Sequence, residues 1–136
     1  MKRILSIFLL VLSVLSTPCI GLAESKGTMT PFYVAIREVE ATLSLSGSTA
    51  SCMGKVKAYD ASTTSTVVVK LMKKNGTAWN EVTRWNGSGS GTSGATAKGT
   101  YSLKSGTYKV ITTGTVKDKN GKVLDSASVE SQQRTY

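Results

Sequence analysis

Residues 103–116 read Leu-Lys-Ser-Gly-Thr-Tyr-Lys-Val-Ile-Thr-Thr-Gly-Thr-Val, and this stretch decides the fold of the chain. A Ser-Gly turn opens it, and a run rich in β-branched residues follows. With the period of two of a strand, Tyr108, Val110, Thr112 and Gly114 share one face. A tyrosine placed just after a glycine turn, at the start of a late strand, is typical of a tyrosine corner. The stretch therefore predicts a β-sandwich with Tyr108 at its corner.

Seven segments of the chain have the composition and the alternation of β-strands. They cover residues 34–45, 50–58, 66–73, 78–85, 96–103, 107–117 and 122–130. In the fourth segment Trp79, Val82 and Trp85 are spaced by three residues, which predicts a β-bulge. We find no helical stretch and no internal repeat. Seven short strands separated by turn signals predict an all-β, immunoglobulin-like β-sandwich of antiparallel strands.

The remaining segments are predicted to be irregular. Residues 86–94 read Asn-Gly-Ser-Gly-Ser-Gly-Thr-Ser-Gly, which is typical of a flexible low-complexity loop. Residues 24–31 are small and polar and are expected to form a flexible leader, and residues 132–136 a tail. The folded domain is therefore expected to cover residues 32–136.

The first 23 residues have the organisation of a secretory signal peptide. A positive start precedes an apolar segment at 4–15 that is too short to span a bilayer comfortably. Small residues at the −3 and −1 positions place the cleavage after Ala23. The mature protein is expected to be secreted and extracellular, without a membrane span. Two alternatives stay open: an uncleaved anchor, and a lipoprotein signal acylated at Cys19, against which the preceding proline argues.

The charge of the chain is strongly positive. Lys and Arg number 17 against 8 Asp and Glu, a formal net charge of +9. Loss of Lys2 and Arg3 with the signal peptide would leave 15 against 8, or +7. Such a charge favours anionic partners, although basic residues interleaved with aromatics, as in specific nucleic-acid binding, are not apparent outside Trp79 and Trp85. We expect a monomer whose partner is an anionic cell-envelope polymer or glycan, with solubility as the alternative role of the charge.

The residue types that usually carry catalysis are scarce. The sequence contains no histidine, the commonest general base and metal ligand. Cys19 and Cys52 cannot form a zinc site by themselves. Asp118, Asn120 and Asp125 surround a turn, but a third acidic ligand and a bidentate glutamate are missing. An Asn-Gly type I′ hairpin turn explains them better than calcium binding does. We expect no catalytic residue, no metal and no cofactor.

Four features support a resemblance to known proteins. They are SLSG at 44–47 leading into ASC at 50–52, VKLMKKNG at 69–76, the paired Trp79 and Trp85, and SGTYKV at 105–110. On these residues the mature chain resembles a family of short, uncharacterised secreted proteins of Gram-positive bacteria with an immunoglobulin-like β-sandwich. The resemblance covers nearly all of the mature chain. It implies the fold, but it carries over no catalytic or binding residue.

Cys52 lies where an immunoglobulin domain places its second-strand cysteine. The partner position, two residues after the corner tyrosine, is occupied by Val110. We therefore interpret Cys52 as a buried free thiol that packs as a small apolar residue. A reactive thiol and an intermolecular disulfide are the alternatives.

Trp79 and Trp85 are the candidate ligand-stacking residues. On a hairpin they could form a platform for sugar rings, or they could cap the edge of the sandwich. The sequence as a whole predicts a secreted, non-catalytic binding or surface-interaction domain. The alternatives are an inhibitor or immunity-type protein that docks a secreted enzyme through its loops, and a self-assembling surface protein.

Overall fold

The computed structural model describes residues 27–29 and 34–136, and within them the chain forms β-strands and no helix. The strands are β1 (Gly27–Met29), β2 (Ile36–Ser46), β3 (Thr49–Ala58), β4 (Thr64–Asn75), β5 (Ala78–Ser90), β6 (Ala95–Ser102), β7 (Thr107–Lys117), β8 (Val123–Glu130) and β9 (Arg134–Thr135). The predicted signal peptide with Cys19 and Ala23, and the expected start of the domain at Phe32, lie outside the described residues.

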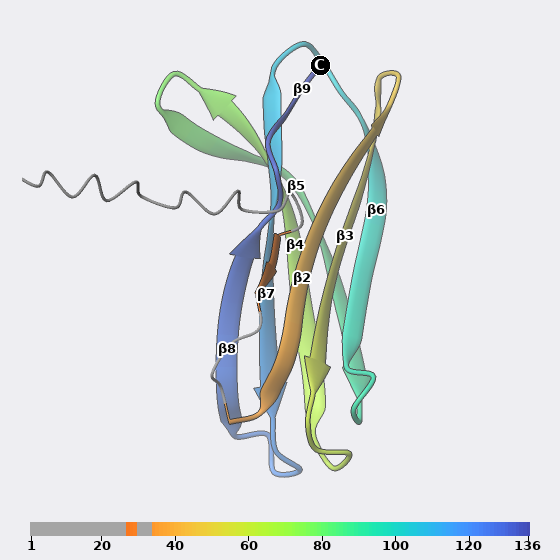
Figure 1. The fold of residues 1–136 in the computed structure, drawn as a ribbon, viewed down its shortest axis with the longest axis vertical. Coiled ribbons are helices and arrows are strands. Elements are labelled where there is room, and N and C mark those ends of the chain that lie inside the picture. The colour runs from red at the N-terminus through yellow and green to blue at the C-terminus, as the bar shows by residue number, and fades with distance from the viewer. Residues whose placement is uncertain (1–26, 30–33) are drawn as a thin grey trace, which may run out of the picture.

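The strands form two antiparallel sheets that face each other (Figure 1). Sheet A has the order β1-β2-β3-β6, and sheet B has the order β5-β4-β7-β8. The short β9 pairs with the start of β7. Strands β2, β3 and β6 of sheet A contact β4, β7 and β8 of sheet B, so the core lies between the two sheets. The predicted two-layer, all-β architecture is therefore confirmed.

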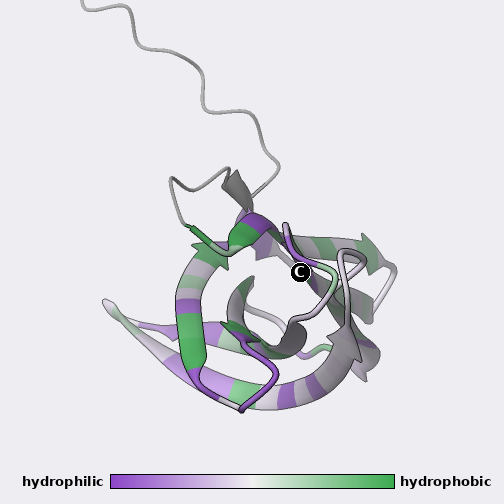
Figure 2. Cartoon of the chain, turned by 90° about the horizontal axis from the view of Figure 1, so that it is seen from below, coloured by the Kyte–Doolittle hydropathy of each residue, from purple (hydrophilic) through white to green (hydrophobic). Residues whose placement is uncertain are grey.

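Alternation along the long strands puts one set of side chains between the sheets. In β7, Tyr108, Val110, Thr112, Gly114 and Val116 are buried, and of the residues that alternate with them only Lys109 is also buried. Figure 2 shows the same alternation as hydrophobic and hydrophilic bands along the strands. Most buried apolar residues are alanine or valine, so the facing sheets need to lie close together for the core to be filled.

Glycines permit this close approach at the centre of the sandwich. A Cβ atom added at Gly54 of β3 would collide with Val69 and Thr112 of sheet B. In the opposite direction, a Cβ atom at Gly114 of β7 would collide with Val56 of sheet A. Each glycine thus faces a branched side chain, and the two inner surfaces interdigitate.

Tyr108 anchors the connection between β6 and β7. Its hydroxyl donates a hydrogen bond of 2.7 Å to the carbonyl oxygen of Lys104, four residues upstream. The ring is buried, with 2% of its surface exposed. The bond satisfies the one polar atom of an otherwise packed ring and holds the preceding loop against the start of β7. It is the hydrogen bond expected of a corner tyrosine.

The glycine-rich segment at 86–94 differs from its prediction. Residues 86–90 are not a loop: they continue β5 and pair with residues 64–68 of β4. Exposed and partly buried residues alternate along them, with Gly87 and Gly89 on the less exposed side. A Cβ atom at Gly87 would collide with the carbonyl of Thr96, and one at Gly89 with that of Gly94. The glycines therefore allow β5 to pass close to the backbone of β6 and its preceding turn.

Two short segments expected to be irregular also join the sheets. Residues 27–29, inside the predicted leader, pair with residues 39–41 of β2. In the predicted tail, β9 pairs with Thr107 and Tyr108. Tyr136 and Gly106 then exchange two backbone hydrogen bonds, of 3.0 and 2.9 Å. Both segments use backbone groups at a sheet edge, which requires no characteristic side-chain pattern.

Replacing Gly87 by alanine tests the role of the glycine-rich segment as a strand. The added methyl group meets the Thr96 carbonyl, so Gly87→Ala is expected to lower the free energy of unfolding by about 2 kcal/mol or more. The neighbouring Ser88 points outward, and Ser88→Ala is expected to stay within about 0.5 kcal/mol of the parent. Denaturant titration measures both. Equal stability of the two variants would mean that residues 86–90 form a free loop.

Candidate binding site on the β4–β5 hairpin

The hairpin of β4 and β5 extends beyond the sandwich (Figure 1). The two strands pair from Thr64 and Ser90 to Asn75 and Ala78, but the register shifts between Leu71 and Met72. Met72 pairs with Glu81 and Leu71 with Thr83, so Val82 is the extra residue. The bulge predicted from the tryptophan spacing is thereby confirmed. Bulges bend and twist a strand. β4 still pairs with β7 at Met72 and Lys73, and the hairpin extends past β7 from Lys74 onward.

Trp79, near the hairpin tip, covers a buried lysine. The ammonium nitrogen of Lys109 lies 4.3 Å from the centroid of the Trp79 ring and 3.0 Å from Oε1 of Glu130. Only 10% of the Lys109 side chain is exposed. The cation–π contact and the ion pair together hold this lysine without leaving its charge unpaired. One face of the Trp79 ring is therefore occupied by the protein itself.

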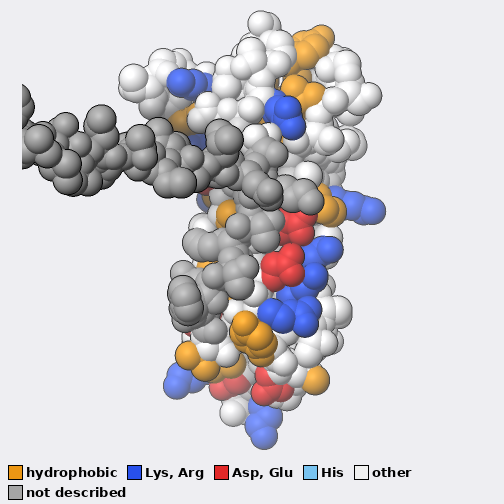
Figure 3. All heavy atoms as spheres, viewed as in Figure 1, with side chains coloured by type: hydrophobic (Ala, Val, Ile, Leu, Met, Phe, Trp, Pro, Cys, Tyr) orange, Lys and Arg blue, Asp and Glu red, His pale blue; other side chains and the backbone are white. Residues whose placement is uncertain are grey.

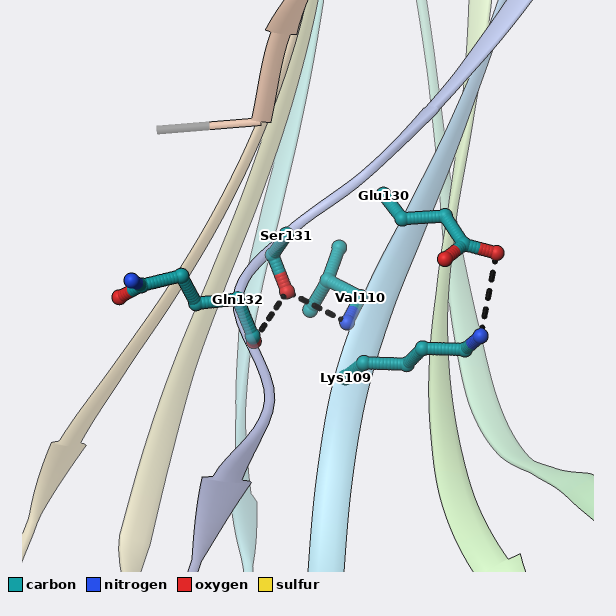
Figure 4. A network of polar contacts seen from close by, with 5 residues as sticks. All are labelled: Lys109, Val110, Glu130, Ser131 and Gln132. Atoms are coloured by element: carbon teal, nitrogen blue, oxygen red, sulfur yellow. Dashed lines mark hydrogen bonds and ion pairs between the residues drawn. The ribbon is translucent and has the colours of Figure 1, made fainter. Parts of the chain in front are cut away.

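Figure 4 shows how β7 and the end of β8 are joined at this point. Lys109 and Glu130 point toward one another. The residues that follow them in sequence, Val110 and Ser131, lie on the other side. Ser131 Oγ accepts a hydrogen bond from the backbone nitrogen of Val110 at 2.8 Å and donates one to the carbonyl of Gln132 at 2.9 Å. β7 and the end of β8 thus hold the Lys109 side chain, which contacts the Trp79 ring near the hairpin tip.

Trp85 lies on the opposite face of sheet B from Trp79. It packs against the hydrophobic core, and its ring fills the space beside Gly99 of sheet A that a side chain there would take. Trp79 contacts Lys109, which alternates with the inward-facing Tyr108 and Val110. The two rings therefore do not form one stacking platform. Trp85 caps the edge of the core, and only Trp79 belongs to the hairpin surface.

The hairpin segment from residue 70 to residue 84 carries more positive than negative charge. Its single acid, Glu81, is held by Arg84 through bonds of 2.5 Å from Nε and 2.7 Å from Nη2. These hydrogen bonds, more than the nearby charges of Arg84 and Lys70, lower the pKa of Glu81. Lys70, Lys73 and Lys74 take part in no ion pair among the described residues. Their ammonium groups remain available to an outside anion.

A hollow of about 310 Å³ lies against this part of the hairpin. Its lining residues are Lys73, Lys74, Asn75, Asn80 and Val82. Lys73 pairs with Asn80 across the hairpin, and its nitrogen lies 5.7 Å from the centroid of the Tyr108 ring. Two ammonium groups and two carboxamides can donate hydrogen bonds to carboxylate or phosphate oxygens. The asparagines were not predicted as site residues, because Asn-Gly at 75–76 is primarily a turn signal.

Several basic side chains outside the hairpin have acidic neighbours. On the face drawn in Figure 3, Lys and Arg side chains are scattered, and Asp and Glu side chains lie beside several of them. On sheet A, Lys57 is paired with Glu38 at 3.1 Å, and Lys55 lies opposite Glu40. On this sheet, acids on the neighbouring strand therefore offset the charge of these two lysines.

Cys52 is buried, with 1% of its surface exposed, and it is free. The Val110 side chain, at the position of the missing disulfide partner, is fully buried in the facing sheet. Burial raises the pKa of the Cys52 thiol to about 11, which disfavours the reactive thiolate. These observations agree with a thiol that packs as an apolar residue.

Asp118 and Asp125 bind different parts of the backbone. The Asp118 carboxylate accepts hydrogen bonds from the backbone nitrogens of Asn120 at 2.8 Å and Lys122 at 2.9 Å. Asp125 instead accepts bonds from the backbone nitrogens of Ala35 and Ile36, which precede and open β2. Over residues 27–29 and 34–136, no three His, Cys, Asp or Glu side chains are grouped for a metal ion.

The turn between β7 and β8 is not the type I′ turn that was predicted. That turn needs a positive φ at both central residues. Gly121 has a φ of 83°, but the φ of Asn120 is not positive. The two backbone hydrogen bonds of Asp118 with Lys122 and Gly121 close the turn instead.

Comparisons with known proteins give no relative: no protein-family model, curated protein or solved structure matches the chain. A search of the described residues for a helix with the length and apolar character of a membrane span found none.

The reactivity of Cys52 tests its burial. Because the folded-state pKa is raised above that of an exposed thiol, the thiol is expected to resist iodoacetamide at pH 8 and to react once denaturant unfolds the chain. The raised pKa also makes stability depend on pH. The protonated thiol contributes to the free energy of unfolding below about pH 9, and this contribution is lost as the pH rises toward about 11.

The parent should therefore lose more stability than Cys52→Ala between these pH values, as measured by denaturant titration. Rapid labelling of the folded protein at pH 8, or an identical pH dependence of the two proteins, would contradict this description of Cys52.

Proposed function

We propose that the protein is a secreted, non-catalytic domain that binds an anionic polymer of the cell envelope, such as a teichoic acid or an acidic glycan, through the β4–β5 hairpin. The observation that carries the proposal is the charge of this hairpin. Lys70, Lys73 and Lys74 form no ion pair among the described residues, while Glu81 is already held by Arg84. A repeating polyanion can meet several separated lysines at once, as a small single-charge ligand cannot.

An immunoglobulin-like identity of the fold is part of the proposal. The strand order supports it: β2-β3-β6 opposite β5-β4-β7-β8 corresponds to A-B-E opposite C′-C-F-G. Tyr108 at the start of β7 and Cys52 on β3 take the positions of the corner tyrosine and the second-strand cysteine. The signal-like first 23 residues, and the resemblance to secreted proteins of Gram-positive bacteria, support the extracellular location.

The projecting position of the hairpin determines the character of the binding. Lys74, Asn75 and Asn80 are exposed, so their contacts with a polymer stay close to water. Contacts of this kind are individually weak and are screened over about 10 Å at 0.1 M salt. Affinity should therefore come from repeated contacts along one polymer, and it should fall steeply as salt rises.

Charge reversal on the hairpin tests this function. Lys73→Glu combined with Lys74→Glu is expected to lower retention on isolated cell walls by about tenfold or more, since contacts of a lysine with an anionic surface contribute about 1 kcal/mol each. The matched control is Lys119→Glu combined with Lys122→Glu, two exposed residues of the loop between β7 and β8, which makes the same change of charge away from the hairpin. Thermal unfolding checks that both variants fold.

The walls are compared with and without their anionic polymers, across a salt series. The proposal requires retention that decreases with added salt, with polymer removal and with the hairpin variant, but little with the control. Equal losses in the two variants, or retention that depends on neither salt nor polymer, would overturn it.

A further inference from the structure

The outer face of sheet A contains a hollow that the hairpin does not share. It measures about 550 Å³, within the range of small-ligand sites. The outward side chains that line it come from three neighbouring strands: Thr42 and Ser44 of β2, Ser51 and Met53 of β3, and Lys98 and Thr100 of β6. Cys52 and Gly99 alternate with them and belong to the inner face, where Cys52 is buried in the core and Gly99 faces the Trp85 ring.

The strand register arranges these six side chains as two rows. Thr42 pairs with Met53 and Met53 with Lys98, while Ser44 pairs with Ser51 and Ser51 with Thr100. Neighbouring strands lie about 4.8 Å apart, and residues two apart on a strand are separated by about 7 Å. The grid is therefore about 10 by 7 Å, comparable to a sugar residue with its substituents.

The polar groups of the grid form few hydrogen bonds or ion pairs with the described residues. Thr42 donates one long hydrogen bond of 3.4 Å to Glu40. For the hydroxyls of Ser44, Ser51 and Thr100, we find no hydrogen bond to any described residue. Lys98 takes part in none of the ion pairs among the described residues. Four hydroxyls and an ammonium group thus face outward around the centrally placed Met53.

We propose that this hollow is a second binding site, and that it takes an acidic saccharide. The hydroxyl side chains can both donate and accept hydrogen bonds, as the hydroxyls of a sugar require. Lys98 supplies the positive charge for a carboxylate, sulfate or phosphate substituent. Met53, adaptable and apolar, contacts the C–H face of the ring. The site uses no residue of the β4–β5 hairpin and does not depend on the function proposed for it.

A titration with two matched probes tests the second site. The probes are a trisaccharide of galacturonic acid and the neutral trisaccharide of galactose, added to the purified protein in a calorimeter at low salt. The acidic probe is expected to bind more tightly. Lys98→Gln is expected to weaken it by about tenfold or more, the loss expected of a charge-assisted hydrogen bond, and to leave the neutral probe nearly unchanged.

The control variant is Lys55→Gln, which removes the same charge from the same face one row away, opposite Glu40. Thr100→Val, which keeps the shape of an exposed side chain but removes its hydroxyl, should weaken both probes. Melting temperatures establish that all variants are folded. The proposal is overturned if the acidic probe fails to bind, if Lys55→Gln weakens it as much as Lys98→Gln, or if only the hairpin variant with Lys73→Glu and Lys74→Glu abolishes its binding.

Discussion

The close approach of the two sheets is the constraint on which the rest of the structure depends. The core contains few large side chains, and Gly54 and Gly114 each receive a branched side chain from the facing sheet. At the edge, Gly87 and Gly89 bring the end of β5 against β6 and the turn before it. Even a buried hydroxyl, that of Thr112, is left without a partner among the described residues in this packing, at a cost of about 1–3 kcal/mol.

The binding that we propose uses the outer surface of this tightly packed sandwich. The outward side chains of sheet A are mainly hydroxyls and charged groups, and they form the shallow hollow around Met53. On sheet B, β4 pairs with β7 as far as Lys73, and Trp79, Lys109 and Glu130 connect the end of the hairpin to β7 and β8. A hairpin anchored in this way, with Lys74, Asn75 and Asn80 exposed, suits the binding proposed above.

Much of the fold could be predicted, because apolar and polar residues alternate with a period of two along a strand that has one buried face. The segment at 107–117 is bounded as predicted, and the corner tyrosine has the hydrogen bond expected of it. The Ser-Gly run at 86–90 was missed although it alternates with the same period. Its inward residues are glycines, so no apolar side chains mark the buried face. A segment rich in glycine and serine is instead interpreted as a loop from its composition. The edge strands β1 and β9 rest on backbone pairing and have no such signal.

The candidate site was less predictable than the fold. The spacing of Trp79 and Trp85 indicated the bulge, but it did not show that the bulge places the two rings on opposite faces of the sheet. Net charge likewise indicated an anionic partner without locating the contact. Which lysines remain free depends on cross-strand neighbours, as Lys57 with Glu38 illustrates, and those neighbours follow only from the register.

The central claim, that a rigid sandwich meets a polyanion with its projecting hairpin, is tested most directly by nuclear magnetic resonance. The ¹⁵N-labelled protein would be titrated with a glycerol-phosphate oligomer, which carries the repeating charge but no sugar ring. The account predicts that amide shift changes concentrate at residues 73–80, that they are reversed by added salt, and that the core of β3 and β7 is unaffected. Changes concentrated in the loop at 117–122, or spread through the core strands, would contradict it.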